Sequence, residues 1–311
     1  MLAETKKLEF DKILLQIKNI AQTDLAKPMV LALEPMTNTL QINRLLDETE
    51  QAKTIIQRFD SSPMTGVLNI KEALKKAEIG SVLTIEEFLR IVSHQEAVTR
   101  NLTFIKKVIQ LQIPYQALDE YYSRLVSLPK IKEAIEAVID PKGEIYDGAS
   151  SKLMSIRKKI KISEDRINAK MASLLQSEAA KLTDSLITIR SNRLVLPVKA
   201  EFKNSFKGIV LDSSSSGETV FMEPLACFQM NNEIQSLLVE ESAEIERILR
   251  ELTEHISLEI VNLRSNLEIL TYLDIVFAKA KYAIEYDCNR PELTKNQINL
   301  QNARHPLISR D

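Results

Sequence analysis

The feature that most constrains the fold is a stretch of alternating residues, 187–224, that stands between two long helical runs. Apolar and polar positions alternate here with a period of two, most clearly around Leu194, Leu196 and Val198, and β-branched residues are frequent. Turn residues interrupt the alternation at 191–192, 204–205 and 213–217. We therefore predict about four short antiparallel strands, with an edge position or a bulge at Pro197, because proline cannot donate to a strand ladder.

The helical runs on both sides of this stretch carry near-heptad apolar seams. The first seam consists of Leu153, Ile156, Ile160, Ser163, Ile167, Met171 and Leu174. The second begins with Ile234, Leu238, Glu241, Ile245 and Leu249 and continues to Leu270. Basic residues dominate the first run and acidic residues the second, which favours antiparallel pairing of the two as a coiled coil. The basic patch at 157–159 is either part of this pairing or a second nucleic-acid contact, and the pairing alone suffices to explain it.

The rest of the chain is rich in helix signals. Only 6 glycines and no tryptophan occur in 311 residues, while Leu, Ile, Glu and Lys are abundant, which indicates a mainly α-helical protein. Asn38 opens one amphipathic helix, and Thr84 with Glu87 forms a capping box before another. The predicted parts are a helical core domain 1–147, an outgoing lever helix 148–186, a β clamp domain 187–225, a returning lever helix 226–264, and 265–311 as the return to the core and lead-in to a further domain.

Several function classes lack support in this sequence. The net charge of −2 gives no global basic footprint, so any nucleic-acid contact must be local. Cys227 and Cys288 stand far apart, without metal-ligand spacing, and no glycine-rich phosphate loop or catalytic triad is recognisable. No signal peptide or membrane span is evident, which fits a cytoplasmic location. We predict no catalytic, cofactor-binding or metal-binding residue and no enzyme activity for this chain.

The alternating stretch itself carries the candidate binding site. Five basic residues between positions 190 and 207 face only Glu201, and a hydroxyl-rich loop follows at 213–217. Cations and hydroxyls of this kind bind phosphate backbones. The predicted nucleic-acid-binding residues are Arg190, Arg193, Lys199, Lys203, Lys207, Ser214 and Ser216. The alternative is a solvated hairpin tip with an ordinary serine loop.

The order of these segments resembles the MutS-II branch of the MutS mismatch-repair ATPases over nearly the full chain. The branch-specific pattern lies in the alternating stretch: Arg190, Arg193, Pro197-Val198-Lys199, Gly208, Asp212, Ser214, Ser216-Gly217 and Glu223-Pro224. The segment 303–306, Ala-Arg-His-Pro, is shared more widely by MutS proteins, shortly before their ATPase domain.

The resemblance implies core, lever and clamp domains, with a dimerising ATPase domain and an Smr nuclease domain outside these residues. ATP and Mg are therefore expected in that ATPase domain, and the protein is expected to be a homodimer through it. The family is linked to suppression of homologous recombination through binding of branched DNA, and to rescue of collided ribosomes. ATP-driven motion would pass along the paired helices and close the clamps.

Three functions remain open from the sequence. The first is a clamp on branched DNA, and the second is an arm that binds the ribosome and its rRNA in translation quality control. The third is a structural coiled-coil dimerisation module. Both of the first two targets present phosphate backbones, so the sequence does not separate them.

Overall fold

The computed structural model describes residues 7–294 and 297–308. The chain divides into two compact units. Met1–Gly143 together with Leu249–Asp311 form the first, which we call the helical unit, and Glu144–Ile248 form the second, which we call the sheet unit. The chain is mainly α-helical with one small antiparallel sheet, as predicted.

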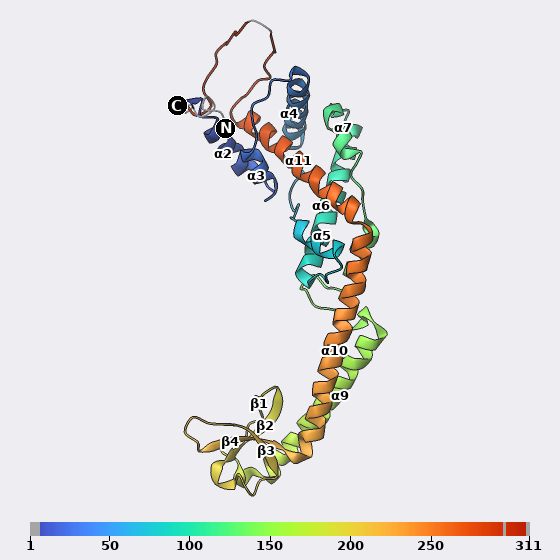
Figure 1. The fold of residues 1–311 in the computed structure, drawn as a ribbon, viewed down its shortest axis with the longest axis vertical. Coiled ribbons are helices and arrows are strands. Elements are labelled where there is room, and N and C mark those ends of the chain that lie inside the picture. Colours follow the sequence, from blue (N-terminus) through green and yellow to red (C-terminus); the bar gives the residue numbers. More distant parts are fainter. Residues whose placement is uncertain (1–6, 295–296, 309–311) are drawn as a thin grey trace. The chain divides into compact units, whose positions relative to one another are not determined.

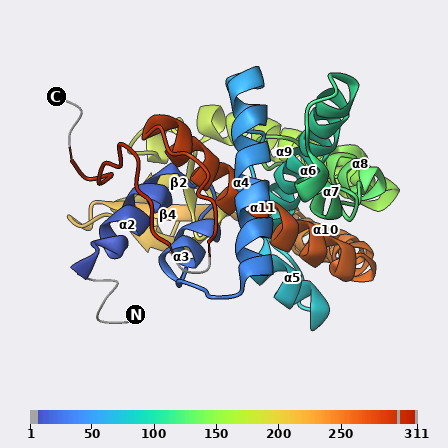
Figure 2. The same cartoon turned by 90° about the horizontal axis from the view of Figure 1, so that it is seen from above.

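The helical unit is assembled around its last helix. Its helices are α2 (Phe10–Ile20), α3 (Ala26–Leu31), α4 (Thr39–Phe59), α5 (Lys71–Glu78), α6 (Ile85–Gln110), α7 (Gln116–Tyr122), α8 (Pro129–Glu136) and α11 (Ile260–Glu285). Helix α11 packs against α2, α3, α4 and α5, and its contact with α4 is the most extensive (Figures 1 and 2). Small and apolar residues occupy most sides of α11, and a helix that is apolar all round is buried.

Side-chain caps begin two of these helices, as the sequence predicts. The Asn38 side chain accepts from the backbone N–H groups of Leu40 and Gln41 at 3.0 and 3.1 Å. The Thr84 hydroxyl accepts from the Glu87 N–H at 3.3 Å, while the Glu87 carboxylate accepts from the Thr84 N–H at 2.9 Å. These bonds satisfy N–H groups that have no partner within the first helical turn.

The sheet unit consists of two helices and a four-stranded sheet. Its elements are η1 (Asp147–Ala149), α9 (Ser151–Ser177), η2 (Ala179–Lys181), β1 (Thr188–Arg190), β2 (Arg193–Lys199), η3 (Ala200–Phe202), β3 (Gly208–Ser213), β4 (Thr219–Pro224) and α10 (Leu225–Leu258). Residues of α10 up to Ile248 belong to this unit, and those from Leu249 onward belong to the helical unit.

Helices α9 and α10 pair in antiparallel fashion, as predicted (Figure 1). Lys152 reaches Glu244 and Arg157 reaches Glu241, so residue numbers rise along α9 while they fall along α10. Ile156, Ile160 and Leu237 form an apolar seam along the same pair of helices. The predicted charge complementarity of the two helices is therefore confirmed by specific ion pairs.

Both helices end earlier than the sequence suggests. Helix α9 ends at Ser177, before the predicted 186, because Leu182 leaves the helix to pack in the sheet's apolar cluster and bridges to Val198. Helix α10 ends at Leu258 and α11 begins at Ile260, where a continuous helix to 264 was predicted. Apolar periodicity continues through this break, since Ile256 and Ile260 share one core cluster, and so it does not reveal the break.

The sheet has the strand order β1-β2-β4-β3 and is antiparallel throughout. Strand β2 pairs with β1 through Val195 and with β4 from Leu196 onward. Pro197 therefore lies beyond the β1 pairing, in a strand that is internal to the sheet, and no bulge occurs at it. The register shift occurs instead in β3, between Val210 and Asp212.

Candidate nucleic-acid interface

The seven predicted site residues are distributed over both ends of the sheet. Arg190 and Arg193 are opposite each other where β1 meets β2. Lys199 ends β2 opposite Thr219, beside the turn that holds Ser214 and Ser216. The backbone carbonyl of Lys207 accepts from Leu225 N–H, just past the other end of β4. The structure thus does not bring all seven residues into one patch.

Arg193 forms an ion pair with a buried carboxylate. Its Nη1 lies 2.9 and 3.0 Å from the two carboxylate oxygens of Glu223, which is 1 % exposed, and its Nη2 donates to Asn232 at 2.6 Å. Asn231 also donates to Glu223, at 2.8 Å. A carboxylate withdrawn from water needs such partners. Arg193 therefore stabilises the junction between the sheet and α10.

Arg190 and Lys199 also make internal contacts. The Arg190 guanidinium pairs with Asp212 at 3.0 Å and lies 4.1 Å from the Phe221 ring centroid, a cation–π distance. The Lys199 ammonium donates to the Ala180 carbonyl at 3.0 Å and lies 5.9 Å from the Phe202 ring centroid. The Asp212 carboxylate offsets the charge of Arg190, whereas the carbonyl bond orients the Lys199 ammonium without neutralising it.

The serine hydroxyls close their own turn. The Ser214 hydroxyl accepts from Thr219 N–H at 3.1 Å, and the Ser216 hydroxyl accepts from Glu218 N–H at 3.4 Å. Their two oxygens lie 3.3 Å apart. Such side-chain bonds are typical of serine-rich turns.

Lys203 and Lys207 differ from the other five residues. Both are exposed, and neither takes part in an ion pair or side-chain hydrogen bond among the described residues. They flank the loop 203–207, which we call the lysine loop and which also exposes Asn204 and Ser205. Sequence reasoning missed these two polar residues, although their place between the lysines was a usable signal.

The lysine loop is anchored to the sheet. Its Phe206 side chain is buried, and Phe206 N–H donates to the Phe202 carbonyl at 2.9 Å. Gly208 follows without room for a side chain, because a Cβ there would meet the Glu223 carbonyl oxygen at 2.7 Å. The loop therefore presents its lysines from a fixed base.

The surplus of basic over acidic side chains in the alternating stretch is small. Residues 187–225 contain five basic side chains and the acids Glu201, Asp212, Glu218 and Glu223. Three of these acids lie beyond position 207, and two of the three, Asp212 and Glu223, are the ion-pair partners of Arg190 and Arg193. The surplus between 190 and 207 is thus largely neutralised by residues that fold back from β3 and β4.

The basic patch of α9 divides in the same way. Arg157 contacts Glu241 and Asp147; burial opposes its charge, yet these two carboxylates hold its pKa above the usual value. Lys158 and Lys159 are exposed and have no ion pair among the described residues. The coiled-coil interpretation therefore holds for Arg157, and two lysines remain for solvent or a ligand.

The described residues hold neither a metal-binding cluster nor a membrane-spanning helix. No group of three or more His, Cys, Asp or Glu side chains there is arranged to hold a metal ion. Among those same residues, every helix is too short or too polar to cross a bilayer.

Comparison with known proteins identifies the family, although no family model matches the chain. Endonuclease MutS2 of Bacillus velezensis is 38 % identical over 307 residues, and that of Clostridium perfringens is 40 % identical over 305 residues. The Bacillus subtilis protein, named putative endonuclease MutS2, is 38 % identical. Each match covers 98 % of this chain, and the chain spans 39 % of the length of these relatives. Over that matched length, the chain belongs to the MutS-II family.

Proposed function

We propose that this chain is the nucleic-acid-binding region of a MutS2-like protein and that it binds branched DNA. The observation that carries the proposal is the lysine loop, whose two ammonium groups have no ion-pair or hydrogen-bond partner in the part of the chain that the structure describes. Free cations bind phosphates by releasing condensed counterions, whereas cations already paired with carboxylates contribute much less. Arg190 and Arg193 accordingly stabilise the sheet, and Lys203 and Lys207 make the contact.

The loop's anchoring supports this assignment. Phe206 is buried between the two lysines, so the loop backbone needs little ordering on binding. Asn204 adds a hydrogen-bond donor at the same surface, whereas the Ser205 hydroxyl donates to the Phe202 carbonyl at 3.1 Å within the loop. Such contacts position a protein on phosphate backbones without selecting a base sequence, as recognition of branch shape requires.

The activities of the complete protein belong to the same proposal. The relatives are named endonucleases, and we propose ATP-driven clamp closure, homodimerisation and suppression of recombination for the full-length protein. No described residue is given a nuclease or ATPase role in this proposal.

The test is the anisotropy of a labelled four-way DNA junction titrated with the chain at several salt concentrations. The double variant Lys203→Glu/Lys207→Glu should bind at least about tenfold more weakly, with a salt slope shallower by about 2, because two phosphate contacts are lost. Lys106→Glu/Lys107→Glu is the matched control, since it makes the same charge change at exposed positions of α6. If both double variants lost the same amount of affinity for the junction, the net charge of the chain and not the lysine loop would explain the loss.

A competition experiment separates DNA from the ribosome as target. Unlabelled junction should displace the labelled junction, and purified ribosomes should displace it poorly. If ribosomes displaced the labelled junction readily, ribosomal RNA would be the preferred target of the lysine loop. Absence of binding by the wild-type chain at low salt would overturn the proposal for this region.

A further inference from the structure

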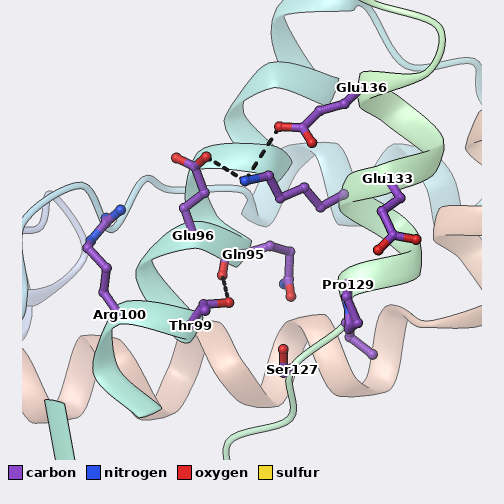
Figure 3. Close-up of a pocket in the computed structure, with 10 residues that line it drawn as sticks. Gln95, Glu96, Thr99, Arg100, Ser127, Pro129, Glu133 and Glu136 are labelled. Carbon is purple, nitrogen blue, oxygen red and sulfur yellow. Dashed lines mark hydrogen bonds and ion pairs between the residues drawn. The ribbon is translucent and has the colours of Figure 1, made fainter. Parts of the chain in front are cut away.

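A pocket of about 660 Å³ lies between α6 and α8 of the helical unit (Figure 3). Its lining includes Gln95, Glu96 and Arg100 from α6, and Pro129 and Glu133 from α8. All of its lining residues belong to the helical unit, so it is separate from the lysine loop. The volume is in the range of sites that bind small ligands or a few residues of a peptide.

Gln95 is the unusual member of this lining. It is 3 % exposed, and neither its Oε1 nor its Nε2 has a hydrogen-bond partner among the described residues. Figure 3 shows its side chain in the space between α6 and α8, with Pro129 and Glu133 across from it. Buried amides almost always have partners, so this group points to a ligand that donates and accepts side by side.

The charges around Gln95 indicate the ligand's charge. The Lys132 ammonium lies 2.8 Å from Glu96 and 3.5 Å from Glu136, so it is already shared between two carboxylates. Glu133 has no ion pair among the described residues, and Arg100 donates to the Thr65 carbonyl at 2.8 Å. Three carboxylates against two cations favour a positively charged ligand and disfavour a phosphate.

We propose that this pocket binds an extended peptide segment that carries a basic side chain. In an extended chain, the N–H and C=O of one residue point to the same side, as in the hydrogen-bonded pairs of antiparallel strands. One such residue can therefore satisfy both polar atoms of Gln95, in the manner of strand addition. The basic side chain then pairs with Glu133. This site is independent of the proposed DNA contact.

An adenine base is the competing ligand chemistry, because a glutamine amide can pair with its N6 and N7. The lining residues offer no aromatic ring for a base to stack on, and their carboxylates repel a nucleotide's phosphate. The lining therefore favours the peptide.

The test uses a fluorescein-labelled alanine pentapeptide with a central lysine, measured by fluorescence anisotropy on the 311-residue chain. Wild-type chain should bind it, and Gln95→Leu should raise the Kd at least about tenfold, since two hydrogen bonds are lost. Methylating the peptide nitrogens one at a time should weaken binding at one position only. Gln110→Leu, at the exposed end of the same helix, should leave the Kd unchanged.

Glu133→Gln gives a second variant whose folding is not at risk, because Glu133 is exposed. It should weaken binding of the lysine peptide and remove the preference over the same peptide with a central glutamate. Unchanged binding in Gln95→Leu, or no binding by the wild type at millimolar peptide, would overturn the proposal. So would adenosine monophosphate binding that is lost in Gln95→Leu while the peptide fails to bind.

Discussion

The two units of the chain differ in how many buried side-chain polar atoms lack a hydrogen-bond partner among the described residues: several in the helical unit, and only the Thr188 hydroxyl in the sheet unit. In the sheet unit, Glu223 and Glu244 are each 1 % exposed, and each pairs with an arginine and further hydrogen-bond donors. In the helical unit, Gln95 and the Tyr122 hydroxyl are buried without a partner among the described residues. Glu48 there is fully buried; tyrosines supply its two shortest hydrogen bonds, and Arg44 pairs with it at 3.3 Å.

The difference follows from the amount of apolar surface that each unit buries. The helical unit has three extensive apolar clusters, whose burial outweighs a few unsatisfied polar atoms. The sheet unit has one such cluster and a short seam between α9 and α10, so its stability depends more on matched charges. Those matched charges are why basic residues at the sheet contribute less to a binding surface than their number suggests.

The largest expected effect on stability comes from removing the Arg193 side chain. Arg193→Ala should destabilise the sheet unit by about 4 kcal/mol, because it leaves the buried Glu223 charge with only an amide partner. Denaturant unfolding followed by circular dichroism, with limited proteolysis of residues 187–225, measures this change.

Arg190→Ala is the matched comparison. Its guanidinium is 37 % exposed and its partner Asp212 is exposed as well, so the expected cost is below about 1 kcal/mol. Equal costs for the two substitutions would contradict the view that buried acids determine which basic residues are structural.

The next largest effect is the pH dependence of the stability of the helical unit, which His94 is expected to cause. Burial lowers the pKa of His94 to about 4, against a smaller opposing effect of the Leu68 backbone. The unfolded chain therefore takes up this proton first as pH falls. About 3 kcal/mol of stability should be lost between about pH 6.5 and pH 4, with little further loss below.

His94→Gln should flatten this part of the pH profile, as measured by denaturant midpoints at a series of pH values. His255→Ala is the control, because His255 is exposed on α10. A profile of the same slope in His94→Gln would assign the acid sensitivity to other groups.

The sequence was sufficient for the fold because its signals are local. The capping pair Thr84 and Glu87, the strand alternation of 187–224 and the opposite charges of α9 and α10 each act over a few residues or along one helix face. The ends of α9 and α10 were harder to predict. Leu182 lies beyond the end of α9 and bridges to Val198 of β2, and tertiary packing decides where such a helix ends.

The candidate site was harder to predict because partners come from distant positions. Arg193 and Glu223 are 30 positions apart, and only the strand register brings them together. A charge count that ends at Lys207 omits the acids of β3 and β4. Lys203 and Lys207 are exposed and have no ion pair among the described residues, although Glu201 stands two positions before Lys203.

A smaller effect is the loss of stability of the sheet unit at lower pH, which Glu244 is expected to cause. Hydrogen bonds from Arg247, Ser150 and Lys152 lower the pKa of Glu244 to about 2, against the opposing effect of burial. The stability that Glu244 contributes is present above about pH 4.5 and should be lost as pH falls toward 2. Glu244→Gln should cost about 2 kcal/mol at neutral pH and nothing near pH 2.

Proteolysis of the two units along a pH series checks this order. The helical unit should weaken first, between pH 6.5 and 4, and the sheet unit below about 4.5. Simultaneous opening of both units at one pH would mean that a single shared group controls both.

The smallest effect concerns the serine turn and returns to the binding surface. Ser214→Ala should cost about 0.5–1 kcal/mol, because Thr219 N–H loses an acceptor in a partly solvated turn. Ser215→Ala should cost almost nothing, since Ser215 is exposed. Junction affinity should change less than about twofold in both, because the Ser214 hydroxyl is already bonded within the turn. A larger affinity loss in Ser214→Ala alone would mean that the turn opens on DNA and gives its hydroxyls to the phosphates, as the sequence predicts.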